Sequence, residues 1–337
     1  MLKTPAKVVA RVLPARASRR LIRRRALGLF YHVVSDERLP HVENLYPYKS
    51  PAVFEHDLLY LKQHFVLLSE TDLQVTRDHP ELRPQLTSIA VTFDDGFAEC
   101  ASVVRPLLLK HAVPCFFFVT TNFLDNKSLH YRGKVSLCID ALTAFDDDRG
   151  SVVAGDLAEL GAPFGWDPDG LARWLLSLGH ADESRVDDVC SALGVDVASY
   201  LQTRQPYLTR AELRRLVDDG FTVGAHSKSH ATPGFLTEDE LEEEIVGSSR
   251  VVMELTGRDQ VPFAFPHSSA GVERAVLQRI VAEHDYIWPL FDGGLARKED
   301  FIVNRLWADR PSANGSGSDL ARTIRRGYAD YLVSLVP

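Results

Sequence analysis

The sequence predicts an α/β fold with a mostly parallel β-sheet, interrupted by an α-helical insertion. Short apolar runs alternate repeatedly with segments of helical periodicity, which is the pattern of parallel strands joined by crossover helices. Polar residues suited to metal binding or acid–base chemistry follow directly after several of these runs, where parallel strands of a barrel bring such residues together. The chain has 337 residues, enough for one large α/β domain with an insertion or for two domains.

The first part of the chain alternates strands with helices. The strands are apolar runs, and the helices have apolar residues three to four positions apart. The predicted elements are a strand at residues 26–31, a helix at 54–65, a strand at 88–93, a helix at 98–111 and a strand at 114–121.

The alternation resumes at Thr209, which with Glu212 resembles the capping-box start of a helix that ends at Gly220. Thr237 is the expected N-cap of a later acidic helix. The elements after Gly220 are a strand at 221–225, a helix at 237–255, a strand at 261–266, a helix at 272–284, a strand at 286–290, a short strand at 301–303 and a terminal helix at 320–333.

Residues 127–205 interrupt the alternation and are helical in character, with predicted helices at 135–145, 171–178 and 186–193. We interpret them as an α-helical insertion that would cap the site or shape a substrate cleft. The predicted organisation is a basic N-terminal arm at 1–25, a split α/β domain at 26–126 and 206–310, the insertion at 127–205, and a linker with a C-terminal helix at 311–337. The Gly/Ser-rich residues 314–318 are the flexible part of that linker.

The charge of the chain is unevenly distributed. The net charge is −8, but residues 1–25 carry nine Lys and Arg and no acidic residue, so the remainder has a net charge of −17. An acidic body argues against a nucleic-acid partner. The basic arm is interpreted as a solvated arm, as a peripheral contact with anionic lipid or as a targeting peptide.

Arginines interrupt every apolar stretch near the N-terminus, so no secretory signal peptide is seen. No apolar run approaches the ~18 residues of a membrane-spanning helix. We therefore expect a cytoplasmic location, with peripheral membrane association through the basic arm as an option. The four cysteines show no CxxC spacing and are interpreted as small buried residues.

Two short motifs together predict a metal site. Residues 92–96 (TFDDG) place Asp94 and Asp95 between an apolar run and a glycine turn, and residues 226–230 (HSKSH) space His226 and His230 four positions apart. One carboxylate with two imidazoles binds zinc or a similar divalent ion. The second carboxylate is a natural base for a water molecule. The alternatives are an ordinary turn and an exposed histidine pair.

These motifs, with FAFP at residues 263–266, resemble the first three motifs of the polysaccharide deacetylase family, the NodB-homology enzymes of carbohydrate esterase family 4. FYHVV at 30–34 resembles the Tyr-His-x-Val start of its bacterial exopolysaccharide branch, which includes poly-N-acetylglucosamine deacetylases. The resemblance covers roughly residues 27–125 and 206–306. It implies a distorted (β/α) barrel of about seven parallel strands, split by the α-helical insertion.

The resemblance also implies a role for individual residues. Asp95, His226 and His230 would bind the metal, and Asp94 would be the base that activates the attacking water. The backbone N–H of His267 would join the metal in stabilising the oxyanion of the tetrahedral intermediate. His267 itself replaces the aromatic residue usual in the family, and its side chain is a further candidate for contact with metal or substrate.

The chain departs from the family pattern in two places. The arginine that precedes the third-motif proline in many members is missing, and Arg305 is the candidate that replaces it in orienting the base; a surface or structural arginine is the alternative. The late Leu-x-His motif of the general acid is also missing, because no histidine follows His284. In the exopolysaccharide branch the N-terminal Tyr-His takes that role, so His32 is assigned as the general acid, with a structural histidine as the alternative.

The expected function is a metal-dependent hydrolase that removes N-acetyl groups from aminosugar units of a polysaccharide or glycan precursor. Zinc is the default metal, and Co, Ni or Fe(II) suit the same ligands. The expected partner is an N-acetylated glycan or oligosaccharide. The alternatives are an O-acetyl esterase or non-sugar amide hydrolase of the same fold, and a catalytically impaired glycan-binding protein, which the missing arginine and late histidine favour.

Overall fold

The computed structural model of the protein describes residues 26–79, 82, 87–294, 301–309 and 319–334. It contains two compact units. The barrel unit comprises Met1–Asp36, Tyr48–Leu124 and Leu208–Pro337, and the helical unit comprises Glu37–Pro47 and Asp125–Tyr207. The basic arm and the linker at 314–318 lie outside the described residues, so the lipid contact, the linker and the cytoplasmic location stay predictions.

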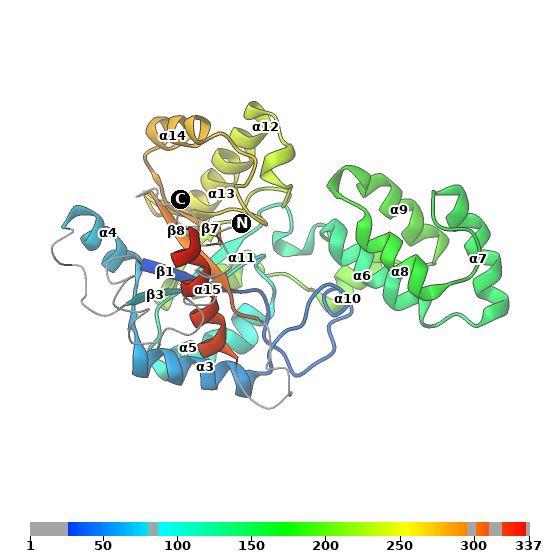
Figure 1. Ribbon diagram of the computed structural model, residues 1–337, viewed down its shortest axis with the longest axis horizontal. Coiled ribbons are helices and arrows are strands. Elements are labelled where there is room, and N and C mark those ends of the chain that lie inside the picture. Colours follow the sequence, from blue (N-terminus) through cyan, green and yellow to red (C-terminus); the bar gives the residue numbers. More distant parts are fainter. Residues whose placement is uncertain (1–25, 80–81, 83–86, 295–300, 310–318, 335–337) are drawn as a thin grey trace. The chain divides into compact units, whose positions relative to one another are not determined.

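Seven parallel strands close into a ring in the barrel unit (Figure 1). The ring order is β1–β3–β4–β5–β6–β7–β8, and β8 pairs with β1. The predicted distorted barrel of about seven strands is therefore confirmed; a register shift between β6 and β7 is part of the distortion. The strands are β1 (Ala26–Tyr31), β3 (Ser88–Phe93), β4 (Cys115–Val119), β5 (Thr222–Ala225), β6 (Val261–Ala264), β7 (Ile287–Gly293) and β8 (Ile302–Trp307), with a short β2 (Val66–Leu67) beside the start of β3.

The strands are apolar on both faces because each face packs in a different core. Alternate residues of a strand point to opposite faces, so Phe116 and Phe118 fall in one cluster while Phe117 falls in the other. The cluster with Phe117 packs under the helices. The second cluster fills the barrel and contains Ala90, Phe116, Phe118, Ala264, Phe291 and Val303.

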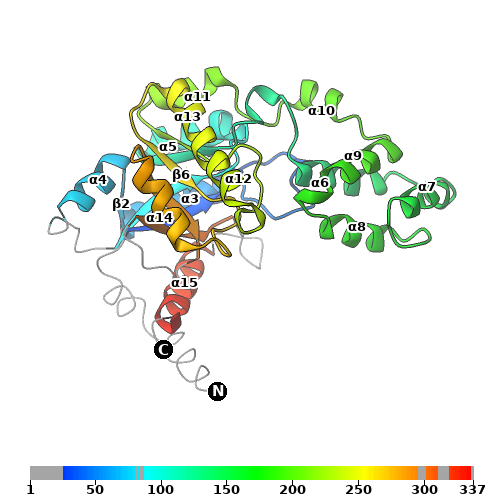
Figure 2. The same ribbon diagram turned by 90° about the horizontal axis from the view of Figure 1, so that it is seen from above.

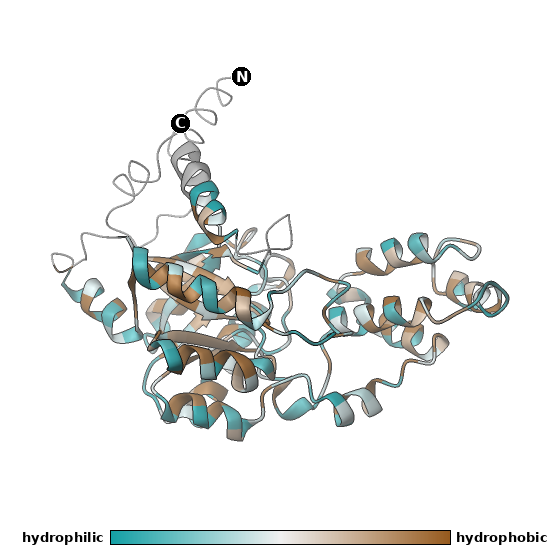
Figure 3. Cartoon of the chain, turned by 90° about the horizontal axis from the view of Figure 1, so that it is seen from below, coloured by the Kyte–Doolittle hydropathy of each residue, from teal (hydrophilic) through white to brown (hydrophobic). Residues whose placement is uncertain are grey.

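Helices lie around this barrel (Figure 2), and Figure 3 shows hydrophobic and hydrophilic residues mixed along those in view. Thr209 and Thr237 form capping boxes at two helix starts, as predicted. No described helix is both long and apolar enough to cross a membrane. The helices are α3 (Pro51–His64), α4 (Glu70–Asp78), α5 (Arg105–His111) after a π-helical turn at Cys100–Val104, α11 (Arg210–Asp218), α12 (Glu238–Glu242), the π-helical η6 (Glu243–Gly247), α13 (Ser248–Thr256), α14 (Arg274–Glu283) and α15 (Leu320–Ser334), with a 3-10 turn at Pro233–Phe235. The buried apolar residues of α3, α11, α13 and α14 pack in the cluster with Phe117.

The helical unit has its own apolar core, which includes Leu157, Leu175 and Val189. The preceding segment Glu37–Pro47 belongs to this unit, because Asn44 donates to the Ser136 carbonyl at 3.0 Å. The elements are α6 (Tyr131–Leu142), α7 (Asp147–Glu159), α8 (Pro168–Ser177), α9 (Glu183–Ala192) and α10 (Val197–Arg204), with 3-10 turns at Leu124–Asn126 and His180–Asp182. The apolar pattern predicts neither α7 nor α10.

The last strands end later than the apolar runs indicate. β7 continues to Gly293, and β8 runs to Trp307 rather than ending at Val303. Asn304 and Arg305 conceal this continuation in the sequence, because polar residues are unusual inside a buried strand. Arg305 therefore lies within β8, with a buried side chain, and not after the strand as predicted.

Candidate active site and metal centre

The predicted site residues lie at the carboxyl end of the barrel. Six of them follow the end of a strand, and Arg305 lies within β8. The backbone N–H of Asp94 donates to the Tyr31 carbonyl at 2.9 Å, and that of His226 donates to the Val119 carbonyl at 2.9 Å. These bonds continue the ladder beyond β3 and β5 and fix where the two motifs leave the sheet. The carboxyl end is where barrel enzymes carry their functional residues.

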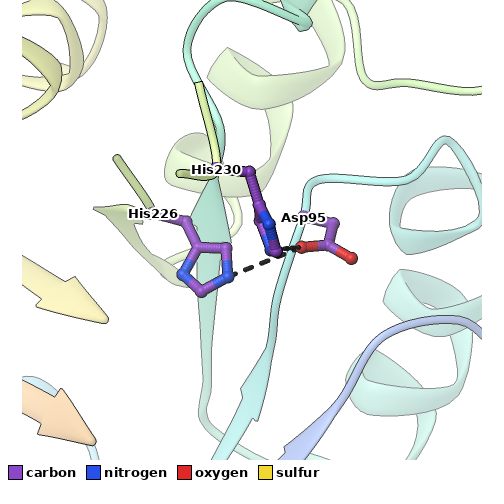
Figure 4. A group of neighbouring side chains, drawn as sticks. All are labelled: Asp95, His226 and His230. Atoms are coloured by element: carbon purple, nitrogen blue, oxygen red, sulfur yellow. Dashed lines mark ion pairs between the residues drawn. The ribbon is translucent and has the colours of Figure 1, made fainter. Parts of the chain in front are cut away.

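Asp95, His226 and His230 form a compact group of ligand atoms (Figure 4). Asp95 Oδ1 lies 3.1 Å from His230 Nε2 and 3.5 Å from His226 Nε2, and all three atoms fall within 4.8 Å of one another. The carboxylate comes from the turn after β3 and both imidazoles from the loop after β5. One oxygen and two imidazole nitrogens facing a common point suit a divalent transition-metal ion.

The protonation states of the group also suit a cation. His226 Nδ1 donates to the Ala264 carbonyl at 2.8 Å, which leaves the lone pair on Nε2 facing Asp95. Burial lowers the pKa of His226 to about 4, so the ring is neutral at pH 7. Burial alone would raise the pKa of Asp95, but His230, His32 and His226 hold it well below its usual range. An ionised carboxylate and a neutral imidazole are what metal binding requires.

The backbone around these ligands adopts conformations that are energetically unfavourable for residues with a side chain. Asp95, Ser227 and His230 have φ of 69°, 65° and 62°, in the left-handed region that residues with a side chain rarely adopt. Gly96 follows with φ 74°, and a Cβ there would lie only 3.0 Å from Val119 Cγ1, so the motif needs its glycine. The Ser227 hydroxyl offsets part of this strain by accepting from the His230 N–H at 2.9 Å.

Asp94 lies beside the ligand group and is held by Arg305. Arg305 Nη1 donates to Asp94 Oδ1 at 2.6 Å and to Thr92 Oγ1 at 3.1 Å, and both charged side chains are buried. The other oxygen, Asp94 Oδ2, lies 3.9 Å from His226 Nε2. One carboxylate oxygen is thus fixed while the other faces the metal-binding group, which is the arrangement a general base needs.

Gly28 makes room for this arginine. Gly28 of β1 stands opposite Arg305 of β8, and a Cβ at Gly28 would overlap Arg305 Cγ and lie 3.1 Å from Cδ. The guanidinium then lies over the rings of Phe30 and Phe118, 4.8 and 5.5 Å from their centroids. A glycine in β1 is therefore part of how Asp94 is positioned through Arg305.

His32 is bound to a carboxylate that our sequence analysis did not identify. His32 Nδ1 lies 2.5 Å from Asp309 Oδ2, and its backbone N–H donates to Asp309 Oδ1 at 3.1 Å. Burial alone would lower the pKa of His32, but the Asp309 charge and hydrogen bond, helped by Asp95 and Asp94, raise it to about 9. His32 therefore carries a proton at neutral pH. No sequence signal indicated Asp309, because the predicted last strand ends at residue 303, whereas β8 continues to Trp307.

His267 follows β6 and borders the same group. Its ring centroid lies 5.0 Å from that of His230, and its φ is 55°. The turn after it is held by Asp292, a buried residue of β7 that accepts from the Ser269 N–H at 2.9 Å and from the Ser269 hydroxyl. Asp292 was also missed in the sequence, because one aspartate near a strand end has no specific spacing.

All seven predicted site residues thus lie around one centre; their roles stay predictions.

Comparisons with known proteins agree with this arrangement. The family model for polysaccharide deacetylase matches residues 180–286, a segment that holds His226, His230 and His267 but begins in the helical unit and leaves out Asp94 and Asp95. No curated protein matches the sequence.

Three solved structures share the fold, at identities that are too low to show more than the fold. The Streptococcus pyogenes deacetylase PplD in complex with acetate aligns with a TM-score of 0.54 and 14% identity over 88% of this chain and 97% of its own. IcaB from Ammonifex degensii aligns with a TM-score of 0.52 and 15% identity over 91% and 97%. A de-N-acetylase from Aggregatibacter actinomycetemcomitans aligns with a TM-score of 0.50 and 13% identity over 88% and 98%.

The family-model match is confined to residues 180–286, and the solved structures share the fold of the chain. The chain is thus similar to polysaccharide deacetylases in its fold and in the segment that carries His226 and His230.

Proposed function

We propose that the protein is a metal-dependent N-deacetylase that removes acetyl groups from N-acetylated aminosugar units of a polysaccharide or of a glycan precursor. The observation that carries the proposal is the Asp95–His226–His230 group beside a second carboxylate, Asp94, that a buried arginine holds in place. The match of residues 180–286 to the family model for polysaccharide deacetylase supports the acetyl group and the glycan as substrate features.

Asp95, His226 and His230 would hold the metal ion, because their ligand atoms converge and because the ionised Asp95 and the neutral His226 fit a divalent cation. Zinc is the default occupant, and Co, Ni or Fe(II) have compatible ligand preferences. When bound, such an ion lowers the pKa of water and polarises a carbonyl oxygen.

The remaining steps belong to residues of this chain. Asp94 Oδ2 takes a proton from the attacking water while Arg305 holds Oδ1. The water oxygen bonds to the acetamide carbon, and the backbone N–H of His267 donates to the oxyanion that forms. The C–N bond then breaks as His32 gives its proton to the leaving nitrogen. The products are acetate and a free amine.

His32 suits the acid role because Asp309 binds its Nδ1 and leaves Nε2 to carry the transferable proton. Its pKa of about 9 keeps this proton in place at neutral pH. The same hydrogen bonds fix the ring orientation, as in other histidine–carboxylate pairs that act in acid–base catalysis.

We expect Asp94→Asn to lower kcat for acetate release from N-acetylglucosamine oligomers by roughly 10²- to 10⁴-fold, because an amide cannot accept the proton of the water. Bound metal should be retained, since Asp94 is not one of the ligands. The measurement is acetate production, with metal content determined on the same samples. Asp285→Asn is the matched control, because Asp285 is an exposed aspartate beyond α14.

Undiminished turnover by Asp94→Asn would refute the base assignment. The same assay on O-acetylated sugars distinguishes the esterase alternative, which predicts faster acetate release from esters than from N-acetyl groups. Absence of any bindable divalent ion in the wild-type protein would favour a glycan-binding protein instead.

A further inference from the structure

The loop that carries both metal-binding histidines rests on a glutamate from a distant helix. Glu244 lies in η6, fifteen residues beyond the end of the loop region it contacts. Its Oε2 accepts from the backbone N–H groups of Lys228 and Ser229 at 2.7 and 3.0 Å. Its Oε1 accepts from the Ser229 hydroxyl at 2.7 Å. Three donors between His226 and His230 thus converge on one carboxylate.

The other side of the loop is held by residues that follow β4, including the Thr120 hydroxyl, which donates to the His226 carbonyl at 3.3 Å. The N–H groups of Thr121 and Asn122, just after β4, donate to the carbonyls of Ser227 and Lys228 at 3.2 and 3.1 Å. The loop is therefore fixed between the end of β4 and the Glu244 carboxylate. Without Glu244, two backbone N–H groups next to the ligands would lose their only charged acceptor.

The loop needs such support because its conformation is strained. Ser227 and His230 both have left-handed φ values, each costing of the order of 1 kcal/mol or more for a residue with a Cβ. A strained segment keeps its conformation only when several hydrogen bonds from the surrounding structure hold it. Relaxation of either residue would turn His230 Nε2 away from Asp95 Oδ1, which now lies 3.1 Å from it.

We propose that Glu244 is a positioning residue for the metal centre, which presets the spacing of the two histidine ligands through the backbone of the loop between them. The inference rests on the metal site of the proposed function and adds a residue outside its motifs. Groups that orient metal ligands typically change metal affinity by 10- to 100-fold when they are removed.

Glu243 provides a matched control at the neighbouring position. It lies in the same turn and contacts the same loop, but it pairs with the Lys228 side-chain ammonium rather than with backbone N–H groups, and its side chain is 61% exposed. Removal of Glu243 changes the local charge by the same amount as removal of Glu244. A difference between the two variants therefore reports the backbone hydrogen bonds, not the charge.

The experiment compares the zinc affinity of full-length Glu244→Ala, Glu243→Ala, Glu244→Gln and wild-type protein by competition with a chelator. We expect Glu244→Ala to weaken affinity by 10- to 100-fold and Glu243→Ala by less than about 3-fold. Glu244→Gln keeps an oxygen that can accept both backbone N–H groups, so it should recover most of the affinity. Alanine is a good helix former, so the fold should persist; circular dichroism of the metal-free proteins checks this.

Equal affinity of Glu244→Ala and wild type would overturn the proposal, as would an equal loss in Glu243→Ala. If Glu244→Ala does not fold, Ser229→Ala supplies the test. It removes one of the three bonds and should weaken affinity by about 2- to 13-fold, the change that corresponds to the loss of one hydrogen bond. No weakening in that variant would then overturn the proposal. A wild-type protein that binds no zinc, cobalt or nickel would contradict the metal site itself, which separates that failure from failure of the Glu244 inference.

Discussion

At the scale of single residues, three side chains of the candidate site are each fixed by a partner from another part of the chain. Asp309 binds His32, Arg305 binds Asp94, and the Ala264 carbonyl binds His226. These partners fix the position of the side chain they bind. The two histidines differ in charge because Asp309 raises the pKa of His32 to about 9, whereas burial lowers the pKa of His226 to about 4.

Asp309→Asn should lower the pKa of His32, because it removes the charge and hydrogen-bond acceptor that raise it above 6.5. An opposite charge in direct contact typically shifts a pKa by about one to three units. The alkaline limb of kcat/KM for deacetylation should therefore move to lower pH, measured as a pH–rate profile against wild type. An alkaline limb at the same pH in both proteins would show that His32 is not the acid.

The same pair should also make stability depend on pH. The folded-state pKa of about 9 lies above the unfolded value of 6.5. The contribution of His32 to the free energy of unfolding is therefore fully present below pH 6.5 and is lost as the pH rises through about 9.

At the scale of elements, the two neighbouring strands β1 and β8 position the base between them. Gly28→Ala should displace Arg305, because the added Cβ overlaps the arginine side chain. We expect kcat to fall by up to about 100-fold, as small misplacements of catalytic groups do, with zinc affinity nearly unchanged because the three ligands are untouched. Steady-state kinetics and zinc titration measure the two effects.

Gly155→Ala is the control for this substitution. Gly155 lies in α7, where an added Cβ meets nothing within 4 Å. It should leave kcat unchanged and stabilise the helix by up to roughly 1 kcal/mol. Full activity of Gly28→Ala would mean that Arg305 is not needed in its present position.

How far the sequence predicts these elements depends on how local their signals are. The strand–helix order, the parallel sheet and the grouping of a carboxylate with His226 and His230 follow from apolar runs that end in polar residues. The closed barrel and the choice of Asp95 as the ligand follow from the resemblance to a known family. Asp309 and Glu244 could not be predicted, because their partners lie 277 and about 15 residues away in the sequence. A single aspartate or glutamate in an acidic chain also gives no signal of a specific role. The membership of Glu37–Pro47 in the helical unit likewise depends on tertiary contacts, such as Asn44 with Ser136, that leave no periodic pattern.

At the scale of the whole molecule, the three metal ligands all belong to the barrel unit, and the helical unit contributes none of them. Zinc should therefore stabilise the barrel unit selectively. At a zinc concentration 1,000-fold above Kd, the free energy of unfolding should rise by about 4 kcal/mol. Hydrogen exchange with and without a chelator measures this for each segment.

We expect zinc to slow amide exchange in β3, β5 and their following loops while the helices α6 to α9 exchange as before. A chelator should reverse the effect. Equal protection of both units, or protection confined to the helices, would contradict a metal site built on Asp95, His226 and His230.

The closed ring of strands also separates order along the chain from order in space. β1 and β8 are neighbours in the barrel although they come from opposite ends of its sequence. A residue after the first strand and one after the last therefore reach the same end of the barrel, as His32 and Asp309 do. A circularly permuted chain that began at β3 and joined β8 to β1 would carry His32 near its C-terminus and keep the His32–Asp309 pair.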